Sequence, residues 1–457
     1  MNEVTARFLE RCAVDTELLE AGIRAPYKAG FASGVGGAML PRPLFISEKH
    51  LRTAAADVAG LIDLVGAVPV RLFDGDAARY AAAIGVPDEQ AAVALRDGLQ
   101  PPPRYGRADL VYDGTRFRLM EANIGSELGG CHIAEANRAL LEVDAFRRFA
   151  DEYQLINVEP GASIAAMLRR VATPVTGGSR DPVVAVAEWT GNYAAYPELY
   201  RMFCVELERH GITVHLAEAP QLLVKDGKVH FNGEPIDIVL RYFTLSDVCD
   251  DPTGGESFDR IRRAHLDGGT VLFTHPQTNM YSYKDNLAFL SDMRNRWAFS
   301  AEESALIDRL LPWTRRLDDG RTDVDGESVD LRAYCLAHRT ELVAKPHWGY
   351  GAMGTYAGWQ TAEDEWARMI EQSPPNAYIV QRRARGTAET VIDPTTGERR
   401  DWLPIHGMYI MDGYGGDYVR ALPADGNALI AVSTGALNAT VFACREGSTA
   451  PDGAVAA

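Results

Sequence analysis

The sequence predicts a mixed α/β protein, with an open α/β unit in its middle and an α+β arrangement in its last third. Two observations predict this class. Short β-branched runs alternate with amphipathic helical segments between residues 183 and 242. Further strand-like runs, separated by a glycine-rich loop and a helix, follow residue 271. The 457-residue length and these changes of pattern divide the chain into regions 1–175, 176–270 and 271–457.

The composition excludes several classes of protein. Apolar residues make up 46% and charged residues 24%, as in a globular protein with a large core. Asp and Glu outnumber Lys and Arg by 63 to 46, and the net charge of −17 repels nucleic-acid backbones and anionic membranes. The longest apolar stretch, 54–70, is interrupted by Asp57 and Asp63 and is too short to span a membrane. With no secretion signal and six scattered cysteines, we expect a cytoplasmic protein without nucleic-acid or membrane partners.

The first region is expected to contain helices and one β-hairpin. Apolar residues recur with helical spacing over 8–19 and 51–65. A run of prolines at 101–103 then precedes two strand-like runs, within 107–121, that are joined by Asp113-Gly114. Asp-Gly between two such runs is typical of a hairpin turn.

The middle and last regions combine strand and helix patterns. In the middle region we expect a helix over 196–210, ended by Gly211, and strands over 183–187, 212–216, 229–231 and 236–242. No G-x-G-x-x-G follows the first of these strands, so the dinucleotide fingerprint is absent. In the last region we expect a helix over 362–371, a solvated charged loop over 315–327, and strands over 341–344, 377–381, 405–411 and 429–432.

Oxygen-bearing side chains lie on both strands of the predicted hairpin. Asp109, Glu121 and Asn123 offer two carboxylates and an amide oxygen, which are ligands that Mg²⁺ prefers. These residues and Arg107 share one face of the ribbon only if the turn is a three-residue loop over 112–114. The alternative is a surface hairpin in which Arg107 pairs with Glu121 across the strands.

A lysine followed by glycines forms a second pattern. Lys345 ends a strand and precedes Gly349, Gly351 and Gly354, so its charge and the amides of the loop suit a phosphate group. The order differs from the Walker pattern, in which the lysine follows the glycines. Lys284 opens a predicted helix, whose N-terminal end also favours anions. The alternatives are a plain glycine-rich connection and solvated lysines.

Three further polar residues lie at or near strand ends. Gln381 ends an apolar strand, and this end offers a packing edge for an adenine ring, with a plain core strand as the alternative. Arg420 follows two glycines and suits a phosphate group, with a surface ion pair as the alternative. Arg241 ends a strand of the open α/β unit, where such sheets bind ligands, and suits a substrate carboxylate, with a surface salt bridge as the alternative.

In this order the patterns resemble those of the ATP-grasp carboxylate–amine ligases, in the circularly permuted branch typified by glutathionylspermidine synthetases. The motif of that branch is R-x-D, a fixed spacer and then E-x-N-x-x-S, and it precedes both lysines. Arg107, Asp109, Glu121, Asn123 and Ser126 reproduce this motif, with eleven residues between its halves and no gap.

The resemblance implies a circularly permuted ATP-grasp fold, with a core built from 1–175 and 271–457 and a pre-ATP-grasp-like domain over 176–270. It also implies ATP and Mg²⁺ as cofactors and a role for each residue. Asp109, Glu121 and Asn123 would hold Mg²⁺; Lys284, Lys345, Gly349, Gly351, Gly354 and Arg420 would bind the phosphates of ATP, and Gln381 its adenine; Arg107 would be catalytic and Ser126 would contact the acid substrate.

The implied reaction is the formation of an amide bond. ATP phosphorylates a carboxylate, and an amine attacks the acyl phosphate, so ADP and phosphate are released. The expected partners are an amino acid, a peptide or a polyamine, and a homodimer is one option for the oligomeric state. Two alternatives stay open, an ATP-dependent phosphotransferase on the same scaffold and a non-catalytic nucleotide-binding protein.

Overall fold

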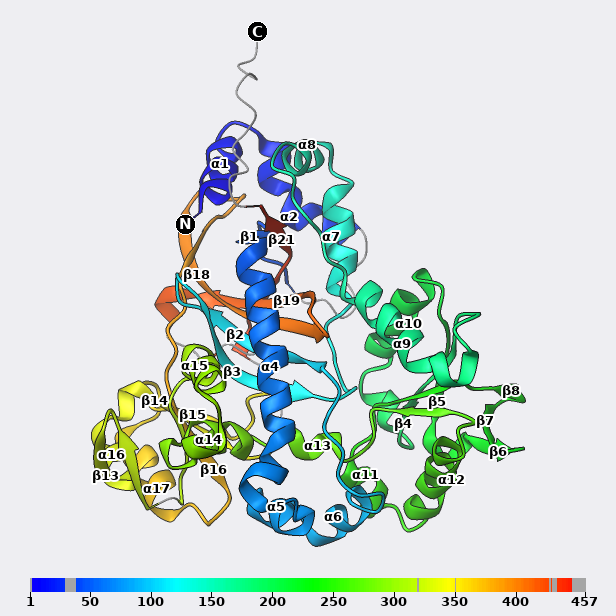
Figure 1. Ribbon diagram of the computed structural model, residues 1–457. Coiled ribbons are helices and arrows are strands. Elements are labelled where there is room, and N and C mark those ends of the chain that lie inside the picture. Colours follow the sequence, from blue (N-terminus) through cyan, green and yellow to red (C-terminus); the bar gives the residue numbers. More distant parts are fainter. Residues whose placement is uncertain are drawn as a thin grey trace.

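Figure 1 shows the computed structural model, which describes residues 2–28, 38–318, 320–349, 351–426, 429 and 434–445. The protein is of the mixed α/β class, as predicted, and its three larger sheets lie in three separate parts of the molecule. A six-stranded sheet lies in the centre, a parallel sheet in the right-hand lobe and a small antiparallel sheet in the left-hand lobe of this view.

The central sheet joins the predicted hairpin to strands from the end of the chain. Its order is β20-β19-β18-β2-β3, with β17 paired to β18, and all neighbours run antiparallel. The strands are β2 (Tyr105–Tyr112), β3 (Phe117–Ile124), β17 (Glu389–Ile392), β18 (Arg399–Met411), β19 (Tyr414–Pro423) and β20 (Leu437–Ala439). Because β2 pairs with β18, residues of the first and last regions share one sheet.

One long helix, α4 (Glu48–Phe73), crosses the central sheet (Figure 1). Among the described residues it is the one helix long and apolar enough to span a membrane, so the prediction that no stretch reaches this length was wrong. Asp57 and Asp63 do not interrupt the helix. Just over half of its most apolar window is buried inside the protein, where it packs on the sheet and on α14 (Asp285–Ser291) and α15 (Ala301–Leu310). This packing is that of a core helix.

The right-hand lobe contains a four-stranded parallel sheet of order β10-β9-β4-β5, with strands β4 (Val183–Glu188), β5 (Thr213–Glu218), β9 (Ile238–Arg241) and β10 (Val271–Phe273). The flanking helices are α9 (Pro160–Thr176), α10 (Pro197–Arg209), α11 (Leu245–Asp250) and α12 (Gly254–Leu266). Val184 and Val186 pack in the layer of α9 and α10, whereas Ala185 and Ala187 pack in the layer of α12, as strand alternation requires. The predicted helix over 196–210 is confirmed, and Gly211 follows it with φ +81°.

The predicted strand over 229–231 belongs to a different sheet from its neighbours. It is part of β7 (Lys228–Phe231), which pairs antiparallel with β6 (Leu223–Lys225) and β8 (Glu234–Pro235). Asp226-Gly227 and Asn232-Gly233 have positive φ at both residues, the geometry of tight hairpin turns. These turns fold the segment back on itself, so it projects from the lobe (Figure 1).

The left-hand lobe contains the small sheet, of order β11-β16-β14-β15. Its strands are β11 (Thr314–Arg316), β14 (Leu342–Pro346), β15 (Tyr356–Ala357) and β16 (Tyr378–Arg382), and they pack on α16 (Leu331–Ala337) and α17 (Glu363–Gln372). The predicted helix over 362–371 and the strands over 341–344 and 377–381 are confirmed, within one or two residues.

The predicted solvated loop over 315–327 was wrong. Part of β11 lies there, and β12 (Arg321–Val324) forms a hairpin with β13 (Glu327–Asp330). Arg315 is 1% exposed because its guanidinium donates to the Ser291 and Thr314 carbonyl oxygens and to the Thr322 hydroxyl. The charge of this segment is visible in the sequence, but the acceptors that allow Arg315 to be buried are not, so the segment was predicted to be solvated. Of the strand predicted over 429–432, all but Leu429 lies outside the described residues.

The remaining elements surround these sheets. Near the N-terminus, β1 (Leu44–Ser47) pairs parallel with β21 (Val441–Cys444), and aromatic residues of α1 and α8 pack against this pair. The other helices are α1 (Glu3–Cys12), α2 (Thr16–Lys28), α5 (Ala77–Ala83), α6 (Asp88–Ala94), α7 (Ile133–Leu141), α8 (Asp144–Glu152) and α13 (Thr278–Tyr281). Short 3₁₀-helices are η1 (Asn192–Ala195), η2 (Ala219–Gln221), η3 (Met293–Ala298), η4 (Arg339–Glu341) and η5 (Ala424–Gly426).

Candidate active site

A cavity of about 1210 Å³ lies between the three sheets. Its walls come from β2 and β3 of the central sheet and from the ends of β4 and β9 in the right-hand lobe. The left-hand lobe contributes β14 and the loop that follows it, which carries Gly349, Gly351 and Gly354 and is called the glycine loop below. Most residues singled out from the sequence line the cavity: Arg107, Asp109, Glu121, Asn123, Lys345, Gly349, Gly351 and Arg420.

Asp109 and Glu121 lie directly opposite each other on β2 and β3. The connection between the strands is a four-residue segment, 113–116, and not the three-residue loop that a shared face was predicted to need. The odd residue is instead Met120, which bulges from β3 next to Glu121. The predicted shared face is therefore confirmed, and the turn predicted to produce it was wrong.

The Asp109 carboxylate lies between two guanidinium groups. Arg420 Nη2 donates to Asp109 Oδ2 at 2.7 Å, and Arg107 Nε lies 3.8 Å from Asp109 Oδ1. Burial by itself raises the pKa of Asp109, but the charges of Arg420 and Arg107 outweigh burial and hold the pKa below its ordinary value. Asp109 is therefore ionised at neutral pH. Its Oδ1 atom is buried and accepts no hydrogen bond.

Lys284 connects the hairpin to the glycine loop. Its Nζ atom lies 3.2 Å from Glu121 Oε1 and donates to the Gly349 carbonyl oxygen at 2.9 Å. The residue immediately precedes α14, as predicted, and is 6% exposed. The alternative of a solvated lysine is therefore excluded, although Lys284 lies behind the cavity wall and does not line it.

Lys345 reaches from β14 to the bulge in β3. Its Nζ atom donates to the Met120 carbonyl oxygen at 2.6 Å and to Gln381 Oε1 at 2.8 Å. Burial lowers the pKa of Lys345 to about 8, although the carboxylates of Glu121 and Asp109 oppose this shift. Lys345 is therefore a buried cation that lines the cavity next to the acidic pair.

The glycine loop presents its backbone to the cavity. Gly349 and Gly351 line it with φ +133° and +65°, conformations that other L-residues rarely adopt. Gly354 instead packs on the Pro346 ring, where an added Cβ would lie 3.0 Å from Cγ. Its φ of +68° also disfavours other residues, so backbone conformation and close packing explain Gly354, which does not line the cavity.

Ser126 and Arg241 lie behind the cavity, contrary to prediction. Ser126 is fully buried, and its hydroxyl donates to the Arg241 carbonyl oxygen and accepts from the Thr274 N–H group. Arg241 is also fully buried; it donates to the Thr274 carbonyl oxygen at 2.8 Å and forms an ion pair with Glu127 at 2.5 Å. Their polar groups are used inside the protein, and Glu127, which Arg241 holds, lines the cavity in their place.

The segment 383–386 forms a part of the wall that was not predicted. It follows β16 and crosses to the central sheet, where Gly386 lies against Val111. Apolar side chains of the two sheets line the cavity together with this segment: Val111, Val343, Leu403 and Ile405. The sequence feature that could have revealed this segment is its position directly after the strand that contains Gln381.

Two carboxylates from the right-hand lobe were also not predicted. Glu188, at the end of β4, and Asp247, in α11, both accept hydrogen bonds from Asn192 Nδ2. Neither forms an ion pair with a lysine or arginine in the described part of the chain. Burial raises the pKa of Glu188, and the negative charge of Asp247 adds to this shift. Tyr200, whose hydroxyl donates to Glu188, lines the same end of the cavity with Tyr196.

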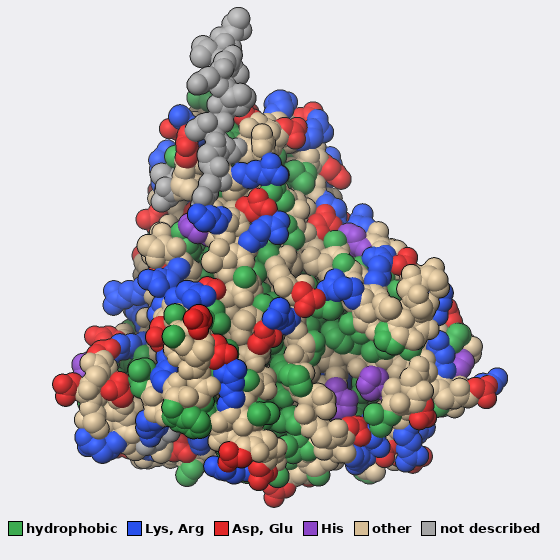
Figure 2. Space-filling model, viewed as in Figure 1, with side chains coloured by type: hydrophobic (Ala, Val, Ile, Leu, Met, Phe, Trp, Pro, Cys, Tyr) green, Lys and Arg blue, Asp and Glu red, His purple; other side chains and the backbone are tan. Residues whose placement is uncertain are grey.

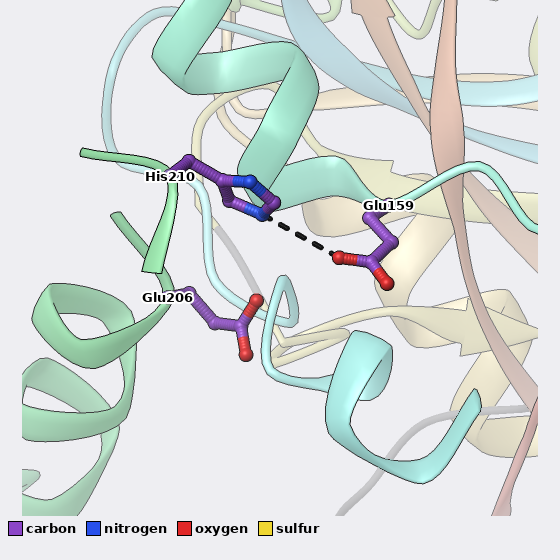
Figure 3. A group of neighbouring side chains, drawn as sticks. All are labelled: Glu159, Glu206 and His210. Atoms are coloured by element: carbon purple, nitrogen blue, oxygen red, sulfur yellow. Dashed lines mark ion pairs between the residues drawn. The ribbon is translucent and has the colours of Figure 1, made fainter. Parts of the chain in front are cut away.

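A second group of potential metal ligands lies outside this cavity. Glu159, Glu206 and His210 point toward one another in Figure 3, and His210 Nε2 lies 3.4 Å from Glu159 Oε2. Arg138 donates to both carboxylates, at 2.8 Å to Glu159. Because Arg138 binds both carboxylates, the group is an ion-pair network that joins α7, α9 and α10.

Within the main cavity, cationic side chains and oxygen ligands lie next to one another. Lys345, Arg107 and Arg420 can hold a polyanion, and the glycine loop adds backbone amides. Asp109, Glu121 and Asn123 can hold a hard divalent cation, and the unpartnered Asp109 Oδ1 atom fits such a role.

No protein-family model matches the chain, and no curated protein matches it.

Proposed function

We propose that the protein is an ATP-dependent ligase that forms an amide bond between a carboxylate and an amine, through an acyl phosphate, with release of ADP and phosphate. The observation that carries this proposal is the convergence of Lys284, Lys345 and Arg420 on the opposed carboxylates of Asp109 and Glu121. Lys345 and Arg420 line the cavity, and Lys284 pairs with Glu121 from behind its wall. This arrangement suits a metal-bound triphosphate.

The arrangement of the sheets supports a circularly permuted ATP-grasp fold as part of this proposal. The central sheet and the small sheet face each other across the cavity, and the parallel sheet closes its third side. The acidic hairpin comes from the first region, whereas β14 and β18 come from the last. ATP would lie between the two antiparallel sheets.

In the proposed complex the adenine ring occupies the apolar part of the cavity. Val111, Val343 and Leu403 supply apolar surface for the ring, and the 383–386 backbone supplies polar groups at its edge. The phosphates extend toward Lys345 and Arg420, with the amides of Gly349 and Gly351 above them.

Asp109, Glu121 and Asn123 would hold Mg²⁺. Asn123 Nδ2 donates to the Arg107 carbonyl oxygen at 3.2 Å, so the amide oxygen is the group that Asn123 offers to a cation. When bound, Mg²⁺ neutralises negative charge on the phosphate oxygens during phosphoryl transfer. Lys345 and Arg420 add fixed positive charge at the same place.

The remaining chemistry is positioning and charge stabilisation by the chain. Arg107 lies beside Asp109 and stabilises negative charge on the reacting carboxylate and on the acyl phosphate. The cavity walls bring the acyl phosphate and the amine together, so the attack is effectively unimolecular. The amine nitrogen bonds to the acyl carbon, the carbon–oxygen bond to phosphate breaks, and the amine loses a proton.

Glu188 and Asp247 favour a positively charged amine. These carboxylates have no cation of their own in the described structure, and Tyr196 and Tyr200 supply aromatic surface beside them. The overall charge of −17 does not carry this inference, because acidic and basic side chains are interspersed over the face seen in Figure 2. The amine of an amino acid, of a peptide or of a polyamine would fit this end of the cavity.

Product analysis tests the proposal. Purified protein with Mg-ATP is incubated with pools of amino acids, small peptides and polyamines, and ADP, AMP and phosphate are quantified. The proposal predicts ADP and phosphate in equal amounts, formed only with a matching acid and amine. ADP without free phosphate would indicate a phosphotransferase, and AMP would contradict the acyl-phosphate mechanism.

A further inference from the structure

Gln381 lies in the small sheet with both ends of its amide group occupied. The residue is fully buried in β16 and does not line the cavity. Its Oε1 atom accepts from Lys345 Nζ at 2.8 Å, and its Nε2 atom donates to Thr314 Oγ1 at 3.1 Å. Because the side chain is buried and does not line the cavity, its amide group does not reach a base there.

The hydrogen-bond network fixes which way this amide points. Thr314 Oγ1 donates its single proton to the Pro312 carbonyl oxygen at 2.8 Å, so it can only accept from Gln381. The group of Gln381 that faces Thr314 is therefore the NH₂ group, and the oxygen faces Lys345. Thr314 itself is fixed, because its N–H group donates to Ser291 Oγ at 2.8 Å.

The Lys345 ammonium group is consequently held in one orientation. It has three N–H donors, of which the Met120 carbonyl oxygen and Gln381 Oε1 take two. Lys345 lines the cavity, so the third N–H group is the one left for a ligand there. Without Gln381, the flexible side chain would lose one of the two acceptors that aim it.

We propose that Gln381 is a positioning residue, which aims the Lys345 ammonium group at the phosphates of the bound nucleotide and does not recognise the adenine base. This inference rests on the proposed function, since it assumes that the cavity holds ATP. It separates two roles that are both consistent with a glutamine at the end of β16. Positioning acts on phosphate binding, whereas base recognition acts on the adenosine part.

Calorimetric titration separates these roles, with Mg-ADP and adenosine as ligands for the full-length protein. In Gln381→Met we expect Mg-ADP affinity to fall about 10- to 100-fold, the effect of losing a hydrogen bond to a charged group, and adenosine affinity to change less than about twofold. The matched control is Gln372→Met, on the exposed end of α17, which should change neither affinity. In a Lys345→Ala background, Gln381→Met should have no further effect on Mg-ADP binding.

Thr314→Val provides a second, milder test, because it removes the anchor of the Gln381 amide and keeps Gln381 itself. It should weaken Mg-ADP binding without weakening adenosine binding, and thermal unfolding of each variant checks the fold. Equal losses of adenosine and Mg-ADP affinity, or unchanged Mg-ADP affinity in both variants, would overturn the inference and leave the proposed function standing. Failure of the wild-type protein to bind Mg-ADP would overturn both.

Discussion

Asp109 on β2 lies directly opposite Glu121 on β3, and the bulge at Met120 places these two carboxylates in register. Without the extra residue, strand alternation would turn one of them to the other face of the sheet. The same bulge presents the Met120 carbonyl oxygen to Lys345 Nζ. One irregular residue therefore aligns the acidic pair and anchors a cation beside it.

The charge of Asp109 is expected to be essential for nucleotide turnover. Asp109→Asn keeps the shape of the side chain and removes its charge, so we expect ATP turnover to fall at least about 100-fold while cooperative thermal unfolding is retained. Asp113→Asn, in the turn of the same hairpin, is the matched control and should turn over ATP normally. Near-normal ADP release by Asp109→Asn would show that the site is assigned incorrectly.

Mg²⁺ is expected to stabilise the protein through the acidic pair. A ligand that binds only the folded state adds about 2.7 kcal/mol at a concentration 100 times its Kd, so Mg²⁺ should raise the midpoint of thermal unfolding. Asp109→Asn and Glu121→Gln should abolish this rise. The measurement is differential scanning fluorimetry at constant ionic strength. Equal rises in wild type and variants would indicate non-specific binding.

The Lys345 pKa of about 8 predicts two pH effects of opposite sign. Only the charged lysine attracts phosphate, so Mg-ADP affinity should fall as the pH rises above about 8. The unfolded chain has the ordinary, higher lysine pKa and binds more protons above pH 8, so the free energy of unfolding should contain a component that increases over the same window. Lys345→Met should remove both effects, which calorimetry and denaturant unfolding on either side of pH 8 would measure.

Glu188 and Asp247 are expected to bind the amine and to have no part in nucleotide binding. Glu188→Gln and Asp247→Asn should each raise the KM for the amine about tenfold, the effect of losing one charge-assisted contact, and leave Mg-ADP affinity unchanged. Steady-state kinetics with the amine identified by product analysis would measure this. An unchanged KM in both variants would show that the amine does not bind next to Glu188 and Asp247.

Ser126 is expected to stabilise the fold and not to contact substrate. Ser126→Ala leaves the Thr274 N–H group without its acceptor, so the free energy of unfolding should fall by about 1–3 kcal/mol. The KM values for acid, amine and ATP should stay within about twofold of wild type, because the hydroxyl does not reach the cavity. A large rise in the KM for the acid, with unchanged stability, would show instead that Ser126 contacts the acid substrate, as the motif implies.

Sequence spacing identified the residues near the cavity better than it identified what they contact. The alternation within 107–123 placed Arg107 and Asp109 on one face correctly, because strand periodicity is local. The bulge that completes this face has no residue signature, and so the turn was predicted wrongly. Ser126 and Gln381 fit the motifs but point into the protein. Their hydrogen-bond partners come from distant segments: the Thr274 N–H group donates to Ser126, and the Thr314 hydroxyl accepts from Gln381.

Residues of the right-hand lobe show a second limit of the sequence. Glu188 lies at the carboxyl end of a correctly predicted strand, yet only the topology brings this end to the hairpin. The same argument from strand ends pointed to Arg241, whose guanidinium is instead covered by Glu127 and Thr274. Whether a polar residue at a strand end faces a ligand depends on the segments that pack over it.

The central claim is that this cavity holds ATP with its phosphates beside the acidic pair. A crystal structure with Mg²⁺ and a non-hydrolysable ATP analogue tests it most directly. The account predicts the adenine ring between Val111 and Leu403, the terminal phosphates in hydrogen-bond contact with Lys345 and Arg420, and a metal ion between those phosphates and Asp109. A nucleotide bound elsewhere, or in this cavity with its phosphates directed away from Asp109, would contradict the account.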